Sequence, residues 1–142
     1  MAVLLDTDHL TLLQRETDPD SYRLAERLGR LAADDVSTSI VSFQEQMQGW
    51  MSYLNRARTA EQIVHAYSEL ERMWRHFCKM NVVSFGQEAQ ERFAALQKQR
   101  IRISTLDLRI AAIALVTDST LLSRNLRHFR QVPGLKVEDW TK

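Results

Sequence analysis

The chain has 142 residues, of which 44% are hydrophobic and 26% are charged, with a formal net charge of +1. This length predicts a single domain, residues 1–142, that buries its own core, and the composition is typical of globular proteins. No apolar stretch approaches the roughly 20 residues of a membrane span, and the amino terminus lacks the basic leader of a signal peptide. Because Cys78 is the single cysteine, no internal disulfide can form. We therefore expect a cytoplasmic protein.

The basic residues are mostly arginine, with 15 Arg against four Lys. Arginine presents a planar fork of donors that suits phosphate or carboxylate partners. This bias favours an anionic ligand or an acidic protein surface, although solvated helix faces would explain it equally well.

Strands and helices are predicted to alternate along the whole chain. Short β-branched or apolar runs predict strands at 2–5, 36–40, 82–85, 120–123 and 135–137. Capping residues and helical spacing of apolar residues predict helices at about 8–15, 19–33, 42–54, 59–78, 86–97 and 105–114. This alternation indicates an α/β fold with a central, mostly parallel sheet that is covered on both faces.

The first strand leads directly into a carboxylate, Asp6, followed by Thr7 and Asp8. Ligands of open α/β sheets gather outside the carboxyl ends of the strands, so Asp6 is predicted to lie where such folds place their chemistry. Thr7 or Asp8 is expected to cap the next helix, with Asp8 in its first turn.

Two further acidic residues are predicted to follow strands or loops in the first turns of helices. Ser42 and Glu45 form an S-x-x-E capping box, and Ser104 or Thr105 is expected to cap a helix that carries Asp107. Taken singly, each acid could simply complement the helix dipole. Together with Asp6 they could converge at one edge of the sheet.

Mutually close carboxylates repel one another unless they are protonated or bridged by a cation. A set of carboxylate oxygens without Cys or His ligands is typical of Mg²⁺ or Mn²⁺. Such ions activate water and stabilise charge on a phosphoryl group, so hydrolysis of a phosphodiester is the reaction that suits these residues best.

Four segments carry a resemblance to a known family. They are LLDTDHL at the amino terminus, SIVSFQEQ around Glu45, STLDLRIAAIAL around Asp107, and LLSRNLRHFRQVPGLKVEDW at the carboxyl end. In this order the segments resemble PIN-domain ribonucleases of the VapC type, the toxins of type II toxin–antitoxin pairs. The likeness covers essentially the full length.

The resemblance implies a three-layer α/β/α sandwich and a metal-dependent endoribonuclease that cleaves structured RNA such as tRNA or rRNA. It places Asp6, Glu45 and Asp107 at the principal acidic positions, which hold Mg²⁺ or Mn²⁺. It also implies a cognate VapB-type antitoxin. The predicted helices from Ser42 to Cys78 carry Trp50, Met51, Tyr53, Tyr67 and Trp74, which are candidates for the protein core, for homodimer contacts or for an antitoxin groove.

One position departs from the family pattern. The family often has a fourth acid after the last inner strand, where this chain has Asn125. We therefore expect one tightly held metal ion, with a second that arrives with RNA. Hydrogen bonds around the metal ligands are predicted for Asn125, Thr7, Ser123 and Asp8, and contacts with RNA phosphates for Arg109, Arg124 and Arg127.

Two other functions remain open from the sequence. The Asp6-Thr7-Asp8 run also resembles the start of haloacid-dehalogenase-type phosphatases, but no lysine before a later acidic pair follows a predicted strand. A PIN-like scaffold that only binds RNA or a partner protein is the non-enzymatic alternative.

Overall fold

The computed structural model describes residues 1–15 and 17–142. Its five strands form one sheet in the order β3-β2-β1-β4-β5, and every strand pair is parallel. The strands are β1 (Val3–Leu5), β2 (Val36–Ser39), β3 (Asn81–Val83), β4 (Thr120–Leu122) and β5 (Val137–Glu138). Strand order reverses between β1 and β4. Open α/β sheets bind their ligands outside the carboxyl ends of the strands at such a point.

Helices connect successive strands on both faces of the sheet. They are α1 (Thr7–Gln14), α2 (Pro19–Gly29), α3 (Ile40–Arg56), α4 (Ala60–Cys78), α5 (Gln87–Lys98), α6 (Thr105–Val116) and the short α7 (Leu126–Phe129). The sequence did not predict α7, and it extended α2 to residue 33, where the chain instead forms a 3₁₀ turn, Ala33–Asp35. No helix among the described residues is both long and apolar enough to cross a membrane.

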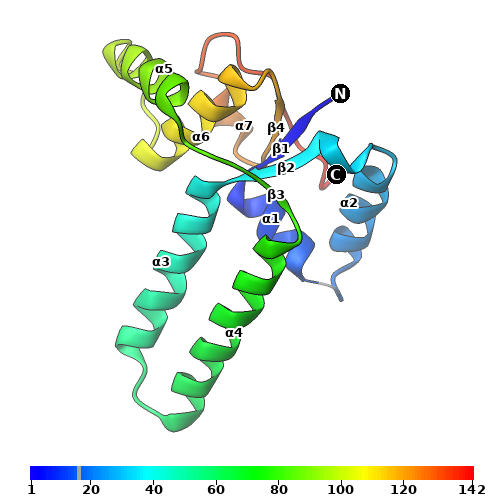
Figure 1. Cartoon of the computed structure of the whole chain (residues 1–142), viewed down its shortest axis with the longest axis vertical. Helices are drawn as coiled ribbons and strands as arrows, with labels where there is room; N and C mark the ends of the chain where they lie inside the picture. The colour runs from blue at the N-terminus through cyan, green and yellow to red at the C-terminus, as the bar shows by residue number, and fades with distance from the viewer. Residues whose placement is uncertain (16) are drawn as a thin grey trace.

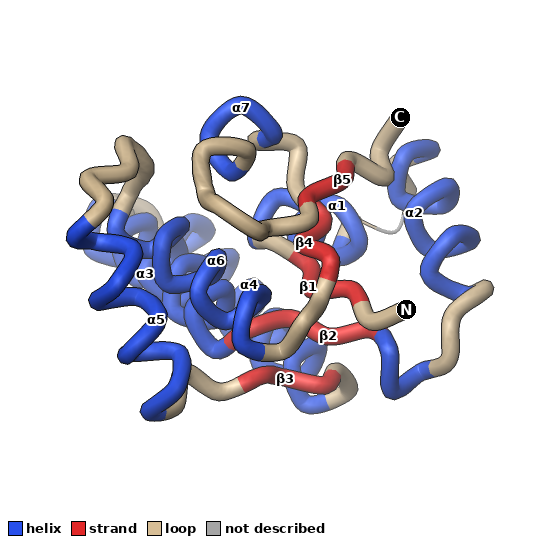
Figure 2. Tube along the Cα trace, turned by 90° about the horizontal axis from the view of Figure 1, so that it is seen from above, coloured by secondary structure: helices blue, strands red, loops and turns tan. Residues whose placement is uncertain are grey.

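Two hydrophobic clusters lie on opposite faces of the sheet, because successive strand side chains point to opposite sides. Leu4 of β1 packs with residues of α5, α6 and α7, whereas Val3 and Leu5 pack with residues of α1, α2 and α4. Figure 2 shows the strands passing between α5 and α6 on one side and α2 on the other. The predicted three-layer α/β/α sandwich is therefore confirmed.

Helices α3 and α4 form a long hairpin that projects away from the sheet (Figure 1). Helix α4 begins at a capping box in which the Thr59 side chain accepts from the Gln62 backbone and the Gln62 side chain accepts from the Thr59 backbone. This cap explains why the helix starts where apolar spacing predicted it.

Candidate metal centre

Asp6 lies at the junction of β1 and α1, where it caps the helix. Its backbone N–H donates to the carbonyl of Leu122 on β4, and its Oδ1 accepts the backbone N–H of Thr7 at 2.8 Å. Its Oδ2 accepts the hydroxyl of Ser123 at 2.7 Å. The N-cap is therefore Asp6 itself and not the predicted Thr7 or Asp8, and Asp6 is only 5% exposed.

Glu45 reaches the same edge of the sheet from α3. The predicted capping box of Ser42 and Glu45 is wrong, because the hydroxyl of Ser39 accepts from the Ser42 backbone and starts the helix at Ile40. Glu45 therefore lies in the second turn, where its side chain points back toward the strand ends. The hydroxyl of Thr7 donates to Glu45 Oε1 at 2.8 Å and lies 3.0 Å from the hydroxyl of Ser42.

Asp107 lies in the first turn of α6, as the sequence predicted. The Ser104 side chain caps this helix by accepting the backbone N–H of Asp107 at 3.1 Å. The cap fixes the start of α6 and thereby the direction of the half-buried Asp107 side chain.

Each of these three acids offers one carboxylate oxygen, and the three oxygens lie within 4.8 Å of one another. Burial raises the pKa of Asp6 to about 7, and the nearby charge of Asp8 adds to the rise against the hydrogen bond from Ser123. Burial, with a smaller contribution from Asp8, also raises the pKa of Glu45 and of Asp107. Ionising all three groups is therefore costly unless a cation binds between them.

The comparisons with known proteins agree with this geometry. Residues 3–135 match the sequence model of the PIN domain. The chain belongs to the PIN domain family. No curated protein matches the sequence.

Solved structures that resemble this PIN domain include chains from VapBC and Fit proteins. The structure of VapBC2 from Rickettsia felis, bound to a DNA fragment from their promoter, has a chain with a TM-score of 0.73 and 19% identity, covering 99% of both chains. VapBC-1 from nontypeable Haemophilus influenzae has a TM-score of 0.68 and 25% identity over 100% of both chains. FitAcB from Neisseria gonorrhoeae has a TM-score of 0.72 and 18% identity over 97% of both chains. The resemblance to VapC-type PIN proteins is thereby confirmed.

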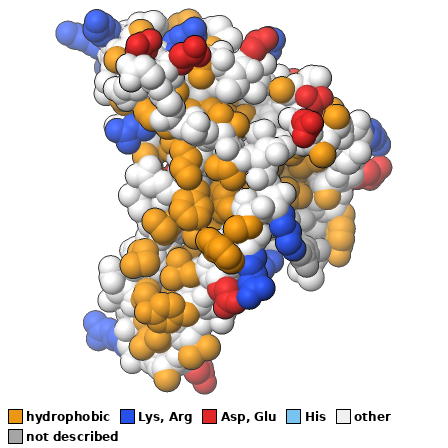
Figure 3. Space-filling view, viewed as in Figure 1, with side chains coloured by type: hydrophobic (Ala, Val, Ile, Leu, Met, Phe, Trp, Pro, Cys, Tyr) orange, Lys and Arg blue, Asp and Glu red, His pale blue; other side chains and the backbone are white. Residues whose placement is uncertain are grey.

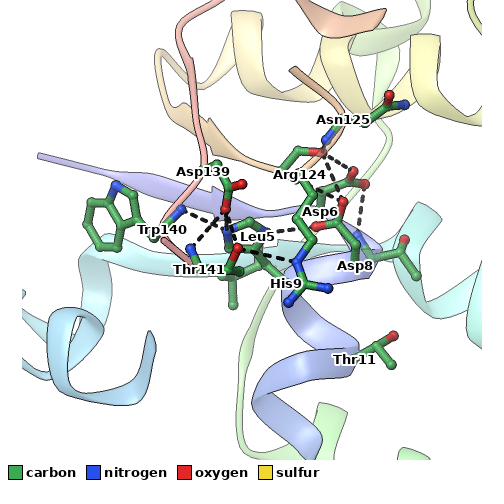
Figure 4. A network of polar contacts seen from close by, with 12 residues as sticks. Leu5, Asp6, Asp8, His9, Thr11, Arg124, Asn125, Asp139, Trp140 and Thr141 are labelled. Carbon is green, nitrogen blue, oxygen red and sulfur yellow. Dashed lines mark hydrogen bonds and ion pairs between the residues drawn. The ribbon is translucent and has the colours of Figure 1, made fainter. Parts of the chain in front are cut away.

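Asp8 of the PIN domain is held beside the cluster rather than within it. Its Oδ2 accepts the Arg124 backbone N–H at 3.0 Å and the Ser123 hydroxyl at 3.2 Å (Figure 4). Its Oδ1 lies 2.7 Å from Nδ1 of the fully buried His9. Because the Trp140 backbone N–H donates to His9 Nε2 at 3.1 Å, that nitrogen carries no proton, and Nδ1–H must donate to Asp8.

Asn125 and the three predicted arginines lie outside the cluster of three carboxylates. The backbone N–H of Asn125 donates to the Ser123 hydroxyl at 3.0 Å, while its amide points away from Asp6 and Asp8 in Figure 4. Arg124 Nε donates to the Thr141 hydroxyl at 3.3 Å, and the guanidinium of Arg109 lies over the Phe93 ring. Arg127 is exposed on α7.

Sequence reasoning missed the connection between the site and the carboxyl-terminal segment. The sequence analysis assigned no role to His9, whereas the structure buries its ring between Asp8 and the segment that contains Asp139 and Trp140. The adjacency of Asp8 and His9 in the sequence could have indicated a hydrogen bond between their side chains. Nothing in the linear order indicated that the carboxyl-terminal segment covers the imidazole ring.

Proposed function

We propose that this PIN protein is an endoribonuclease that depends on Mg²⁺ or Mn²⁺ and hydrolyses phosphodiester bonds. The observation that carries the proposal is the convergence of Asp6, Glu45 and Asp107 to within 4.8 Å, although they are far apart in sequence. The donor set consists of carboxylate oxygens alone, which fits a hard divalent cation. Membership of the PIN family favours a nuclease over the phosphatase that the Asp6-Thr7-Asp8 run resembles.

Asp6 and Asp107 would hold the ion directly, and Glu45 would hold it or orient the attacking water. When bound, the ion would lower the pKa of water and would balance the negative charge on the phosphoryl group. Thr7 restricts Glu45, since its hydroxyl donates to Oε1 and leaves Oε2 free to face the ion or to accept a proton from water.

Ser123 ties the neighbouring carboxylates together. Its hydroxyl lies 2.7 Å from Asp6 Oδ2 and 3.2 Å from Asp8 Oδ2, so it can be shared between them. Asn125 in turn donates its backbone N–H to this hydroxyl, which orients the Ser123 proton toward the acids. We assign the positioning of RNA phosphates to Arg109, Arg124 and Arg127, of which Arg124 and Arg127 are exposed.

We further propose that the protein is the toxin of a cytoplasmic toxin–antitoxin pair, with a VapB-type antitoxin and with tRNA or rRNA as its substrate. The similarity to chains of VapBC structures over nearly their full length supports this assignment.

A homodimer is proposed through the outer face of the α3–α4 hairpin. Figure 3 shows hydrophobic side chains gathered along this hairpin. The exposed apolar residues there include Met47 and Met51 on α3, with Ile63, Val64, Tyr67 and Trp74 on α4. Apolar surface of this kind usually marks a protein interface.

A cleavage assay tests the enzymatic proposal. Purified protein is incubated with total tRNA and rRNA, with EDTA or with added Mg²⁺ or Mn²⁺. We expect discrete fragments that require the metal and disappear in Asp6→Asn. Asp118→Asn is the matched control, because Asp118 is exposed, lies before β4 and ion-pairs with Lys136 at 3.6 Å. A folded protein that binds RNA but never cuts it would instead support the binding scaffold.

A further inference from the structure

The imidazole of His9 belongs to a closed ring of contacts at the edge of the proposed metal centre (Figure 4). Its Nδ1–H donates to Asp8, and its Nε2 accepts the backbone N–H of Trp140. On the next residue, the Thr141 hydroxyl accepts from Arg124 Nε, and the Arg124 backbone N–H donates to Asp8. The ring therefore joins α1, the loop after β4 and the carboxyl-terminal segment around one carboxylate.

The carboxylate of Asp8 is held from two sides. Its Oδ2 accepts the Ser123 hydroxyl at 3.2 Å and the Arg124 backbone N–H at 3.0 Å, which ties it to the loop after β4. On the other side, the 2.7 Å hydrogen bond from His9 fixes Oδ1. The terminal torsion of an aspartate is soft, so a carboxylate held at one oxygen can still rotate. The donor from His9 therefore gives Asp8 a single orientation.

The orientation of Asp8 bears on all three acids of the cluster. Burial is the main cause of the raised pKa of Asp6, Glu45 and Asp107, and the charge of Asp8 contributes to the rise in each. The Ser123 hydroxyl lies 2.7 Å from Asp6 Oδ2 and 3.2 Å from Asp8 Oδ2, so a displaced Asp8 would also free this hydroxyl to turn. Hydrogen bonds to a ligating carboxylate orient it toward its cation.

The ring of His9 is itself prevented from moving. It is 0% exposed, and the Trp140 backbone N–H fixes Nε2 at 3.1 Å. Trp140 packs in the hydrophobic cluster with residues of α1 and α2, and the guanidinium of Arg27 lies 4.3 Å from its ring centroid. Asp139 Oδ1 lies 3.7 Å from Nε2 and accepts the backbone N–H and hydroxyl of Thr141. His9 therefore holds Asp8 from a rigid base.

We propose that His9 is a positioning residue of the metal centre, which acts through Asp8 and raises the affinity of the site for Mg²⁺ or Mn²⁺. The proposal rests on the metal-dependent function proposed above and adds a residue that would contact neither the ion nor the substrate. A neutral ring with its proton on Nδ1 satisfies both neighbours, because Asp8 requires a donor and the Trp140 backbone N–H requires an acceptor. Groups that support metal ligands in this way contribute roughly 10- to 100-fold to metal affinity.

Two substitutions separate the two ends of the ring. His9→Asn places an amide donor near the position of Nδ1, so it keeps the contact with Asp8 and loses the acceptor for Trp140. His9→Gln places an amide oxygen near the position of Nε2, so it keeps the contact with Trp140 and leaves Asp8 Oδ1 without its donor. Calorimetric titration with Mn²⁺, at a pH above the pKa of Asp6, measures the affinity of each variant. We expect Kd to rise roughly 10- to 100-fold in His9→Gln and to stay close to that of the unsubstituted protein in His9→Asn.

A third variant tests whether His9 acts through Asp8. Asp8→Asn should weaken Mn²⁺ binding at least as much as His9→Gln, and the double variant should bind no more weakly than Asp8→Asn alone. Leu12→Ala is the matched control for lost stability, because Leu12 lies on the same helix, is 3% exposed and packs in the hydrophobic cluster. It should lower Tm without changing the affinity for Mn²⁺. Thermal melts in EDTA confirm that each variant is folded.

Several results would overturn the role of His9. Equal Mn²⁺ affinity of the folded His9 variants, or of Asp8→Asn, would leave the ring a purely structural part of the core. A loss of affinity in His9→Asn would mean that the donor to Asp8 is not what supports the site. Tighter binding in His9→Gln would mean that His9 holds Asp8 away from the ion. If the unsubstituted protein binds no Mn²⁺, the proposed metal centre fails and this inference fails with it, whereas the other results concern His9 alone.

Discussion

The imidazole Nδ1–H of His9 donates to Asp8 Oδ1 at 2.7 Å, while the other ring nitrogen accepts the backbone N–H of Trp140 at 3.1 Å. A fully buried ring therefore connects an acid beside the proposed metal centre to the last residues of the chain. The carboxyl-terminal segment takes part in the site through this contact, although it supplies no carboxylate to the cluster.

We expect His9→Ala to lower the free energy of unfolding by about 2–4 kcal/mol, because it opens a cavity and leaves a buried N–H without an acceptor. Urea unfolding measures this loss. A double-mutant cycle with Asp8→Ala should give a coupling energy of about 1–2 kcal/mol. Strictly additive effects would show that the contact between the two side chains contributes nothing.

Metal binding should strengthen with rising pH. Burial raises the pKa of Asp6 to about 7, so below that pH a proton competes with the cation for the carboxylate. We expect the Mg²⁺-induced rise in Tm to be small at about pH 5.5 and large at about pH 8, and calorimetry in two buffers to detect proton release. A Tm shift that is independent of pH across this range would contradict the assignment of Asp6 as a ligand.

Asp6→Asn should stabilise the metal-free protein at neutral and alkaline pH. The pKa of Asp6 is about 7 in the folded protein against its ordinary value of 3.8, so the folded state holds an extra proton between these limits. The stability of the wild-type protein therefore falls as pH rises from about 4 to about 7, and the amide variant avoids this loss.

The gain from Asp6→Asn is expected to be on the order of 2 kcal/mol at about pH 8 and to vanish near pH 4. Asparagine also retains the helix cap. Urea unfolding in EDTA measures the difference, with Asp118→Asn as the control. A less stable Asn variant at high pH would mean that the hydrogen bonds from Ser123 and Thr7 outweigh the burial of charge.

Ser104→Ala should destabilise the start of α6 by about 1 kcal/mol, because it removes the acceptor for the Asp107 backbone N–H. The loss should be accompanied by lower kcat in the cleavage assay, since the cap directs Asp107 toward the cluster. Ser104→Asn keeps a capping oxygen and should restore both. If Ser104→Ala lowers stability while kcat stays constant, the cap has only a structural role.

Local sequence determined the parts of the site that depend on neighbours in the chain. The short apolar run before Asp6 predicted a buried strand that ends in a carboxylate, and the structure places Asp6 there. Ser104 or Thr105 was predicted to cap the helix that carries Asp107 in its first turn, and the structure shows that Ser104 is the cap. Both features arise within a few residues, where backbone hydrogen bonds and side-chain oxygens decide the conformation.

Tertiary structure decided which distant groups meet. The sequence predicted Ser42 as the cap of α3, but β2 ends at Ser39 and the Ser39 side chain caps the helix instead, which places Glu45 in the second turn. The order of strands placed Ser123 beside Asp6, and packing of the last residues enclosed His9. The sequence predicted that acids could converge. Whether their oxygens come together depends on sheet order and helix packing, which are set by burial of the whole core rather than by any local pattern.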